Sequence, residues 1–122
     1  MTARRLHHAS VPCPPDLLAA VEAFYRDAIG MRPIPNLAGV RWFELPNGDH
    51  LHVLDGAGLA DTRAHFALEV DDLEATLARC RFHGSEPEPQ PPIWGAPRWF
   101  VRDPAGNLIE LFDTPPLLAE RE

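Results

Sequence analysis

Hydrophobic and polar positions along the chain fall into two successive runs of the same kind. The first run predicts a strand over 6–12, a helix over 16–29 that stops at Gly30, and strands over 32–36, 39–45 and 49–55. The second run predicts a strand over 63–71, a helix over 73–82 capped by Asp72 and stopped by Gly84, and strands over 86–90, 97–102 and 107–113. Each half of the chain is therefore predicted to fold as β-α-β-β-β.

The last predicted strand carries one carboxylate in an apolar setting. Glu110 lies between Ile109 and Leu111, with Leu108 and Phe112 on either side. A carboxylate that enters a sheet interior without a partner is strongly unfavourable. We therefore expect Glu110 to have a cationic partner.

The stretch around Glu110 occurs twice. Residues 46–55 align without a gap to residues 104–113, with identical Pro, Gly and Asp positions, and this places His52 at the position of Glu110. The first strands of the two halves agree in the same way, because His8 aligns with His65. Each half thus places one ligand-type side chain on its first strand and one on its last, giving the candidate metal ligands His8, His52, His65 and Glu110.

Strand alternation predicts that these four side chains share a face. If 104–106 is a three-residue hairpin loop with Gly106 in the left-handed conformation, Glu110 lies opposite Phe100, and the matching loop 46–48 sets His52 opposite Trp42. The apolar positions of the first strands would be covered by the helices, which leaves His8 and His65 on the opposite face. We expect one cleft, with a pocket that includes Ser10, Trp42, Trp94, Arg98, Phe100 and Phe112.

Several of these residues have two interpretations. Arg98 is either a clamp for an anionic substrate or a partner of Glu69 or Glu110. Trp42 and Phe100 are either pocket walls or core aromatics. The proline-rich run 87–97 is predicted to be a rigid loop of the kind that forms lids, with Trp94 where it would touch a ligand.

The remaining histidines are given no ligand role. His7 shares parity with the helix-packed Ala9, and His83 follows a helix. His50 shares the face of His52, so it could at most support the ligands from behind.

Composition restricts the class of protein. At 122 residues the chain is one domain-sized unit (1–122), so modules of about 5–56 and 63–114 must share a core. A hydrophobic fraction of 45% without a long apolar run is typical of a soluble protein that does not enter a membrane, and the net charge of −7 argues against nucleic acid. No secretory signal opens the sequence, and Cys13 and Cys80 have no motif spacing, so we expect reduced thiols and a cytoplasmic location.

This two-module pattern resembles the vicinal oxygen chelate superfamily, the glyoxalase/bleomycin resistance protein/extradiol dioxygenase fold. The resemblance covers nearly the whole chain and rests on His8 and on residues 23–30, 65–72 and 103–111. It implies an α+β fold in which two βαβββ modules in tandem form a cleft-lining mixed sheet with the helices on the outer face. Each module supplies half of a closed surface, so we expect a homodimer in which modules pair either within one chain or between chains.

The resemblance also implies a function. We expect a metal-dependent enzyme, lyase/isomerase or dioxygenase-like, that acts on a small oxygen-bearing substrate chelated to a divalent metal, with Glu110 as the catalytic residue. Three imidazoles and one carboxylate suit Zn, Fe, Mn, Ni or Co without choosing among them. Glyoxalase-like members typically have Glu or Gln at the position of His52, whereas extradiol dioxygenases and thiol transferases resemble the subset His8, His65 and Glu110.

The alternative function is a non-catalytic binding protein of the bleomycin-resistance type. Such a protein would hold an aromatic, drug-like ligand between Trp42, Phe100 and Trp94 without metal chemistry. Metal content of the purified protein separates the two functions.

Overall fold

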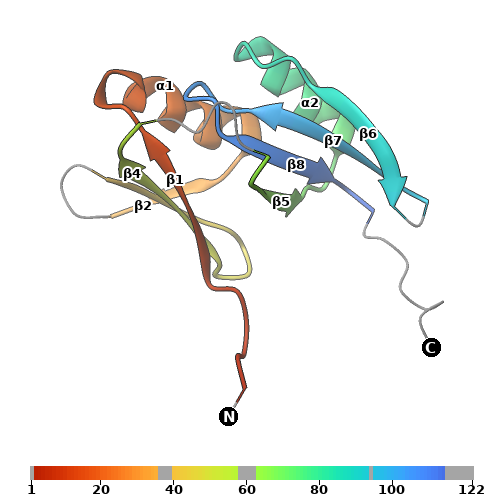
Figure 1. Cartoon of the computed structure of the whole chain (residues 1–122), viewed down its shortest axis with the longest axis horizontal. Coiled ribbons are helices and arrows are strands. Elements are labelled where there is room, and N and C mark those ends of the chain that lie inside the picture. Colours follow the sequence, from red (N-terminus) through yellow and green to blue (C-terminus); the bar gives the residue numbers. More distant parts are fainter. Residues whose placement is uncertain (1, 36–39, 58–62, 94, 115–122) are drawn as a thin grey trace.

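The computed structural model describes residues 2–35, 40–57, 63–93 and 95–114, which form two four-stranded mixed sheets with helices beside them (Figure 1). The first sheet has the order β1 (His8–Cys13), β4 (His50–Asp55), β3 (Arg41–Glu44) and β2 (Arg32–Ile34). The second repeats it with β5 (His65–Glu69), β8 (Leu108–Phe112), β7 (Ala96–Arg102) and β6 (Glu88–Ile93). In each sheet the first pair is parallel and the others are antiparallel. The predicted α+β fold of two tandem modules is confirmed.

The helical segments of the two modules lie next to each other. The first is continuous but changes type, from the 3-10 helix η1 (Pro15–Leu17) through α1 (Leu18–Ala23) to the π-helix η2 (Phe24–Ile29). The second is α2 (Leu73–Phe82), which packs against η2 and whose Arg79 Nε donates to the Ala28 carbonyl at 2.9 Å. None of the described helices is long and apolar enough to cross a membrane.

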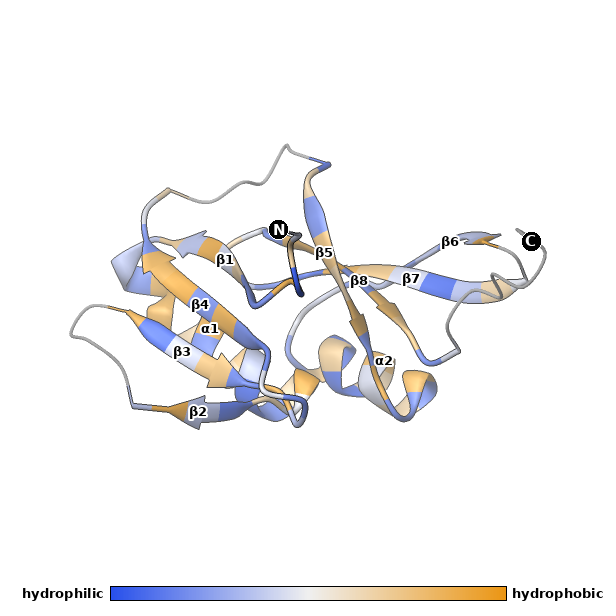
Figure 2. Cartoon of the chain, turned by 90° about the horizontal axis from the view of Figure 1, so that it is seen from below, coloured by the Kyte–Doolittle hydropathy of each residue, from blue (hydrophilic) through white to orange (hydrophobic). Residues whose placement is uncertain are grey.

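The core lies between the sheets and the helices. Alternating strand residues are buried on the helix-facing side, and Figure 2 shows the resulting alternation of hydropathy along the strands. The buried positions include Val11, Phe43, Leu51 and Val53 in the first module and Leu68, Val101, Ile109 and Leu111 in the second. The opposite face of each sheet carries the candidate ligands together with aromatic residues such as Trp42 and Phe100.

The two hairpin turns set the register of the candidate ligands. Gly48 and Gly106 have φ of 89° and 90°, a left-handed conformation that glycine adopts without a steric penalty. The resulting register places Trp42 opposite His52 and Phe100 opposite Glu110. Both predicted pairings are confirmed.

A buried polar network joins the second hairpin to the first module. Tyr25 of η2 donates through its hydroxyl to Asp103 Oδ2 at 2.7 Å, and Asn107 Nδ2 donates to the Pro12 carbonyl at 2.9 Å. Asp103 is only 4% exposed and also accepts from Asn107 Nδ2 at 2.8 Å. The turn that leads into the strand of Glu110 is therefore fixed to η2 and β1.

The proline-rich run differs from its prediction. Residues 88–93 form β6, which pairs with β7, with an irregularity between Gln90 and Ile93. β6 is an edge strand, where a proline without an N–H interrupts no ladder on its outer side. The prediction of a separate loop over 87–97 is therefore wrong, and Trp94 lies outside the described residues.

Candidate metal centre

The second module brings two candidate ligands together. His65 on β5 and Glu110 on β8 approach with Nε2 and Oε1 3.2 Å apart. His65 Nδ1 lies 2.9 Å from the Arg63 carbonyl, which can only accept, so Nδ1 carries a proton. In the neutral ring the Nε2 lone pair then faces a carboxylate oxygen. Two facing acceptors need a proton or a metal ion between them, and two N/O ligands of one ion are separated by about 2.9 to 3.4 Å, from bond lengths near 2.1 Å.

Arg98 on β7 completes this half of the site. Its Nη1 donates to Glu110 Oε1 at 3.1 Å, and its Nε donates to the Pro91 carbonyl at 2.9 Å. The side chains of Arg98 and Glu110 are 20% and 14% exposed. Glu110 therefore has the cationic partner expected from its apolar neighbours.

The first module brings the other two candidates together in a stack of rings. His52 on β4 lies between His8 on β1, with centroids 4.3 Å apart, and Trp42 on β3, with centroids 4.1 Å apart and planes within 10°. His52 is 9% exposed, and this burial, together with the nearby His8 and His50, lowers the pKa of His52 below its usual value. His52 is therefore held in the neutral form, which is the form that binds metal ions.

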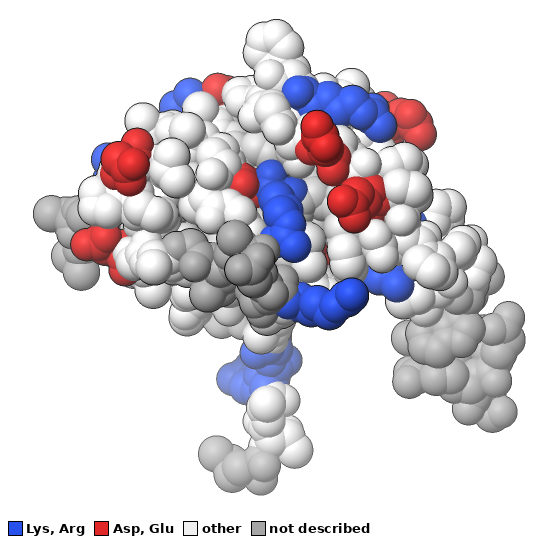
Figure 3. Space-filling view, turned by 45° about the horizontal axis from the view of Figure 1, so that its top comes forward, with Lys and Arg blue, Asp and Glu red and all other residues white. Residues whose placement is uncertain are grey.

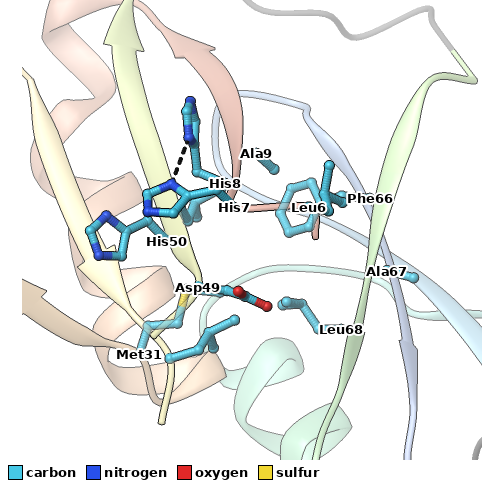
Figure 4. Close-up of a pocket in the computed structure, with 12 residues that line it drawn as sticks. Leu6, His7, His8, Ala9, Met31, Asp49, His50, Phe66, Ala67 and Leu68 are labelled. Carbon is cyan, nitrogen blue, oxygen red and sulfur yellow. Dashed lines mark hydrogen bonds between the residues drawn. The ribbon is translucent and has the colours of Figure 1, made fainter. Parts of the chain in front are cut away.

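Two further histidines adjoin the stack. His7 and His8 have their Nδ1 atoms 3.1 Å apart (Figure 4). His50 Nδ1 lies 3.3 Å from His52 Nε2. His50 Nε2 is 3.5 Å from Glu44 Oε2. His7 precedes the first residue of β1, so strand alternation does not test its predicted parity with Ala9. Two features indicate this cluster: His7 and His8 are adjacent in the sequence, and His8 pairs with His50 in the neighbouring strand.

A crevice of about 90 Å³ lies beside this cluster, between the modules of the same chain (Figure 4). Its lining is mainly apolar and comes from both modules, with Ala9, Met31, Leu51, Phe66 and Leu68 among its residues. His7, His8 and His50 line the same crevice, as does Ala67, which pairs with Glu110 in the strand register. The crevice therefore lies at the junction of the two modules and adjoins the candidate ligand His8.

The four candidates are thus arranged as two pairs, one on each sheet. Among the residues that the structure describes, no three His, Cys, Asp or Glu side chains lie so that they could hold one metal ion. His8 with His52, and His65 with Glu110, are each close pairs, but a single chain does not unite them. Convergence of the two pairs on one ion stays a prediction.

The predicted pocket residues fall on the same faces. Ser10 is paired with His52 and Phe112 with Glu69 in the strand register, and the Phe100 ring lies 5.0 Å from that of His65. An open groove of about 780 Å³ passes Phe100, Leu108 and Gln90. Among the described residues on the face in Figure 3, acidic and basic side chains are interspersed without an extended basic surface.

A sequence profile of the Glyoxalase/Bleomycin resistance protein/Dioxygenase superfamily matches residues 5–111. The chain belongs to this superfamily. No curated protein matches the sequence significantly.

Solved structures of the superfamily share the whole fold. The oxidase ChaP-H2 is 27% identical with a TM-score of 0.74, over 94% of this chain and 97% of that one. TnmS3, an antibiotic-binding protein from a Streptomyces species, is 25% identical with a TM-score of 0.71, over 94% and 99%. The fosfomycin resistance protein FosX from Listeria monocytogenes, complexed with Mn(II) and sulfate, is 20% identical with a TM-score of 0.79, over 99% and 96%. The superfamily thus contains both enzymes and binding proteins, and the choice between them depends on the site.

Proposed function

We propose that this protein is a metal-dependent enzyme of the vicinal oxygen chelate type that acts on a small oxygen-bearing substrate. The observation that carries the proposal is the contact between His65 Nε2 and Glu110 Oε1, which lie 3.2 Å apart while the Arg63 carbonyl holds His65 Nδ1. His8, His52, His65 and Glu110 would hold the ion, and this ligand set suits Zn, Fe, Mn, Ni or Co. When bound, such an ion supplies Lewis-acid polarisation of the substrate oxygens.

The remaining residues of the site position these ligands. Arg98 orients the Glu110 carboxylate through Oε1, while Oε2 accepts no hydrogen bond from the described residues and is free to take a proton from the substrate. The stack against Trp42 fixes the ring of His52, and His52 in turn fixes that of His8. Glu110 is therefore the catalytic base in this proposal.

A homodimer would unite the two pairs. β1 and β5, which carry His8 and His65, are each the outer strand of a sheet, so each module can meet a module of a second chain along this edge. We propose that His8 and His52 of one chain share an ion with His65 and Glu110 of its partner. Cys13 and Cys80 are both free and buried, which suits the predicted cytoplasmic location.

The aromatic rings of the site favour a second function. The stack of His8, His52 and Trp42, and the contact of Phe100 with His65, offer flat surfaces for a planar ligand. A binding protein of the bleomycin-resistance type would use these rings and need no metal. Similarity to the antibiotic-binding TnmS3 supports this alternative.

The substitution Glu110→Gln tests the proposed metal centre. In chelator it should lower the free energy of unfolding by about 1 to 3 kcal/mol, because Arg98 loses a charged hydrogen-bond partner. It should also weaken metal affinity by a factor of about 10 or more and remove most of the stabilisation that metal gives. Melting temperatures of wild type and variant, each with chelator and with excess metal, provide the measurement.

The control is Glu69→Gln, an exposed carboxylate on the strand of His65. It should leave both the apoprotein stability and the metal response close to wild type. A Glu110→Gln protein that gains as much stability from metal as wild type would contradict the metal centre. Wild-type protein that takes up no metal on reconstitution would instead favour the binding function.

A further inference from the structure

We propose, resting on the metal centre proposed above, that Arg98 is a specificity-determining residue that selects substrates with an anionic oxygen group next to the chelating oxygens. The ligand class is a small carboxylate or similar oxyanion. Arg98 would bind the charged oxygen of the substrate, while the metal ion would bind a neighbouring oxygen of the same substrate. In this view Arg98 has two successive partners, Glu110 in the empty site and the substrate in the loaded site.

The position of the guanidinium suits this role. Arg98 Nε is held by the Pro91 carbonyl at 2.9 Å, and the guanidinium carbon lies 5.6 Å from the centroid of the Phe100 ring. These two contacts fix the group without using Nη2, which donates to none of the described residues. In the part of the chain that the structure describes, Nη1 contacts only Glu110 Oε1, at 3.1 Å. An arginine anchored at Nε with its outer nitrogens available can bind an oxyanion through two parallel hydrogen bonds.

Charge balance gives the physical reason for an anionic ligand. In the empty site Arg98 and Glu110 compensate each other, and their side chains are 20% and 14% exposed. A divalent ion on Glu110 adds two positive charges, while the histidines bind it in the neutral form. The partly buried group then carries a net charge of about +2, and a negatively charged substrate is the ligand that compensates it.

The internal repeat indicates that the fold itself does not need this arginine. The register places Phe100 opposite Glu110 and Trp42 opposite His52, so the position of Arg98 in the second module corresponds to Val40 in the first. The neighbouring Arg41 points to the other face, where it pairs with Glu22 of α1. A βαβββ module of this chain is therefore formed with an apolar residue at the position of Arg98.

The test compares two probes of nearly equal size that differ by one negative charge. Oxalate and oxamate are titrated calorimetrically into Mn(II)-loaded wild type, Arg98→Gln and Arg98→Lys, after Mn(II) binding has been measured for each protein. Arg98→Gln should weaken oxalate binding by about 10- to 100-fold, the range for a hydrogen bond to a charged group, and oxamate binding less. Arg98→Lys keeps the charge but not the two parallel hydrogen bonds, so it should restore only part of the preference for oxalate. Because Arg98 also orients Glu110, the titrations are made at Mn(II) concentrations that saturate each protein.

The matched control is Arg102→Gln. Arg102 lies on the same strand and face, is exposed and donates to the Gly106 carbonyl at 2.8 Å, so its loss should leave both titrations unchanged. Equal losses of oxalate and oxamate in Arg98→Gln, or no loss of either with Mn(II) bound normally, would overturn the role of Arg98 and leave the metal centre intact. Failure of wild type to bind Mn(II) or another divalent ion would overturn both.

Discussion

His52 shows how a single side chain in this site is controlled by its neighbours. It is enclosed by the rings of His8 and Trp42 and lies 3.3 Å from His50. Burial is the main reason for its lowered pKa, and the nearby imidazoles add to it, since each disfavours a second positive charge. The unfolded chain therefore takes up a proton at His52 at a higher pH than the folded protein does.

This difference predicts a pH dependence of stability in the absence of metal. Above the ordinary value of 6.5 both states hold His52 neutral, and stability is not affected. As the pH falls below that value the unfolded state is protonated first, so stability is lost until the pH passes the lowered pKa of the folded state. Urea denaturation in chelator from about pH 8 to pH 5 measures this loss of stability across the range in which histidine titrates.

The variant His52→Gln should have a smaller loss of stability over this range, because its side chain does not titrate. His83→Gln, at the end of α2 and away from the stack, is the control and should follow wild type. An equal slope for His52→Gln and wild type would show that another group causes the pH dependence.

At the scale of elements, a buried hydrogen bond joins η2 of the first module to the β7–β8 turn of the second. The hydroxyl of Tyr25 donates to Asp103 Oδ2 at 2.7 Å, and burial, followed by the charge of Asp103, raises the pKa of Tyr25 well above its ordinary value. Tyr25 therefore stays a donor at all ordinary pH values. Tyr25→Phe should cost about 1.5 to 3 kcal/mol, the range for a hydrogen bond to a charged group.

A double-mutant cycle separates this link from general packing. The combined loss in Tyr25→Phe with Asp103→Asn should be smaller than the sum of the two single losses, because Tyr25→Phe removes the hydrogen bond and Asp103→Asn removes the charge that strengthens it. Urea denaturation of the four proteins gives the coupling. Additive losses would mean that Tyr25 contributes by packing alone.

Most elements could be predicted where a local signal fixes their ends. α2 has the predicted bounds, because the Asp72 side chain accepts from the Ala75 N–H at 3.0 Å and Gly84 takes a positive φ of 90°. Gly106 likewise fixes the register of β8, which is why the partner of Glu110 across the strands was predicted correctly. The strand predicted over 86–90 continues as β6 to Ile93, and this continuation was missed because its prolines are permitted by its edge position, which is a property of the sheet rather than of the local sequence.

The site was predictable to a similar extent. Alternation predicted which face each candidate occupies, and the repeat predicted which residues are equivalent. Neither pattern contains the distance between the two sheets, so the separation of His8 and His52 from His65 and Glu110 in one chain could not be derived from them. Arg98 was left between a role as a substrate clamp and pairing with Glu69 or Glu110, because alternation gives the face of a side chain but not which neighbour on that face its long side chain reaches.

At the scale of the whole molecule, this separation leads to the proposed dimer. Each chain has two half-sites, and each half-site adjoins an outer strand, β1 or β5. A symmetric pair of chains would join each half-site to the complementary one and form two equivalent centres. Light scattering should therefore give the mass of two chains at micromolar concentration, and a monomer that binds metal tightly would contradict pairing between chains.

Complementation between two defective chains tests this arrangement directly. His8→Ala and Glu110→Gln homodimers should each lack tight metal binding, because every centre in them has lost a ligand. In a heterodimer one centre combines both defects, whereas the other combines the intact His8 of one chain with the intact His65 and Glu110 of its partner. Unfolding and refolding an equal mixture should therefore restore about one quarter of the wild-type tight sites, since half of the dimers are mixed and each has one intact centre.

The control is a mixture of His8→Ala with His52→Ala, two changes in the same half-site. It should restore no tight sites, because every centre then contains a defective half-site from one chain or the other. If the centre were instead formed within one chain, neither mixture would recover binding, and the elemental analysis of the refolded protein would distinguish the two assemblies.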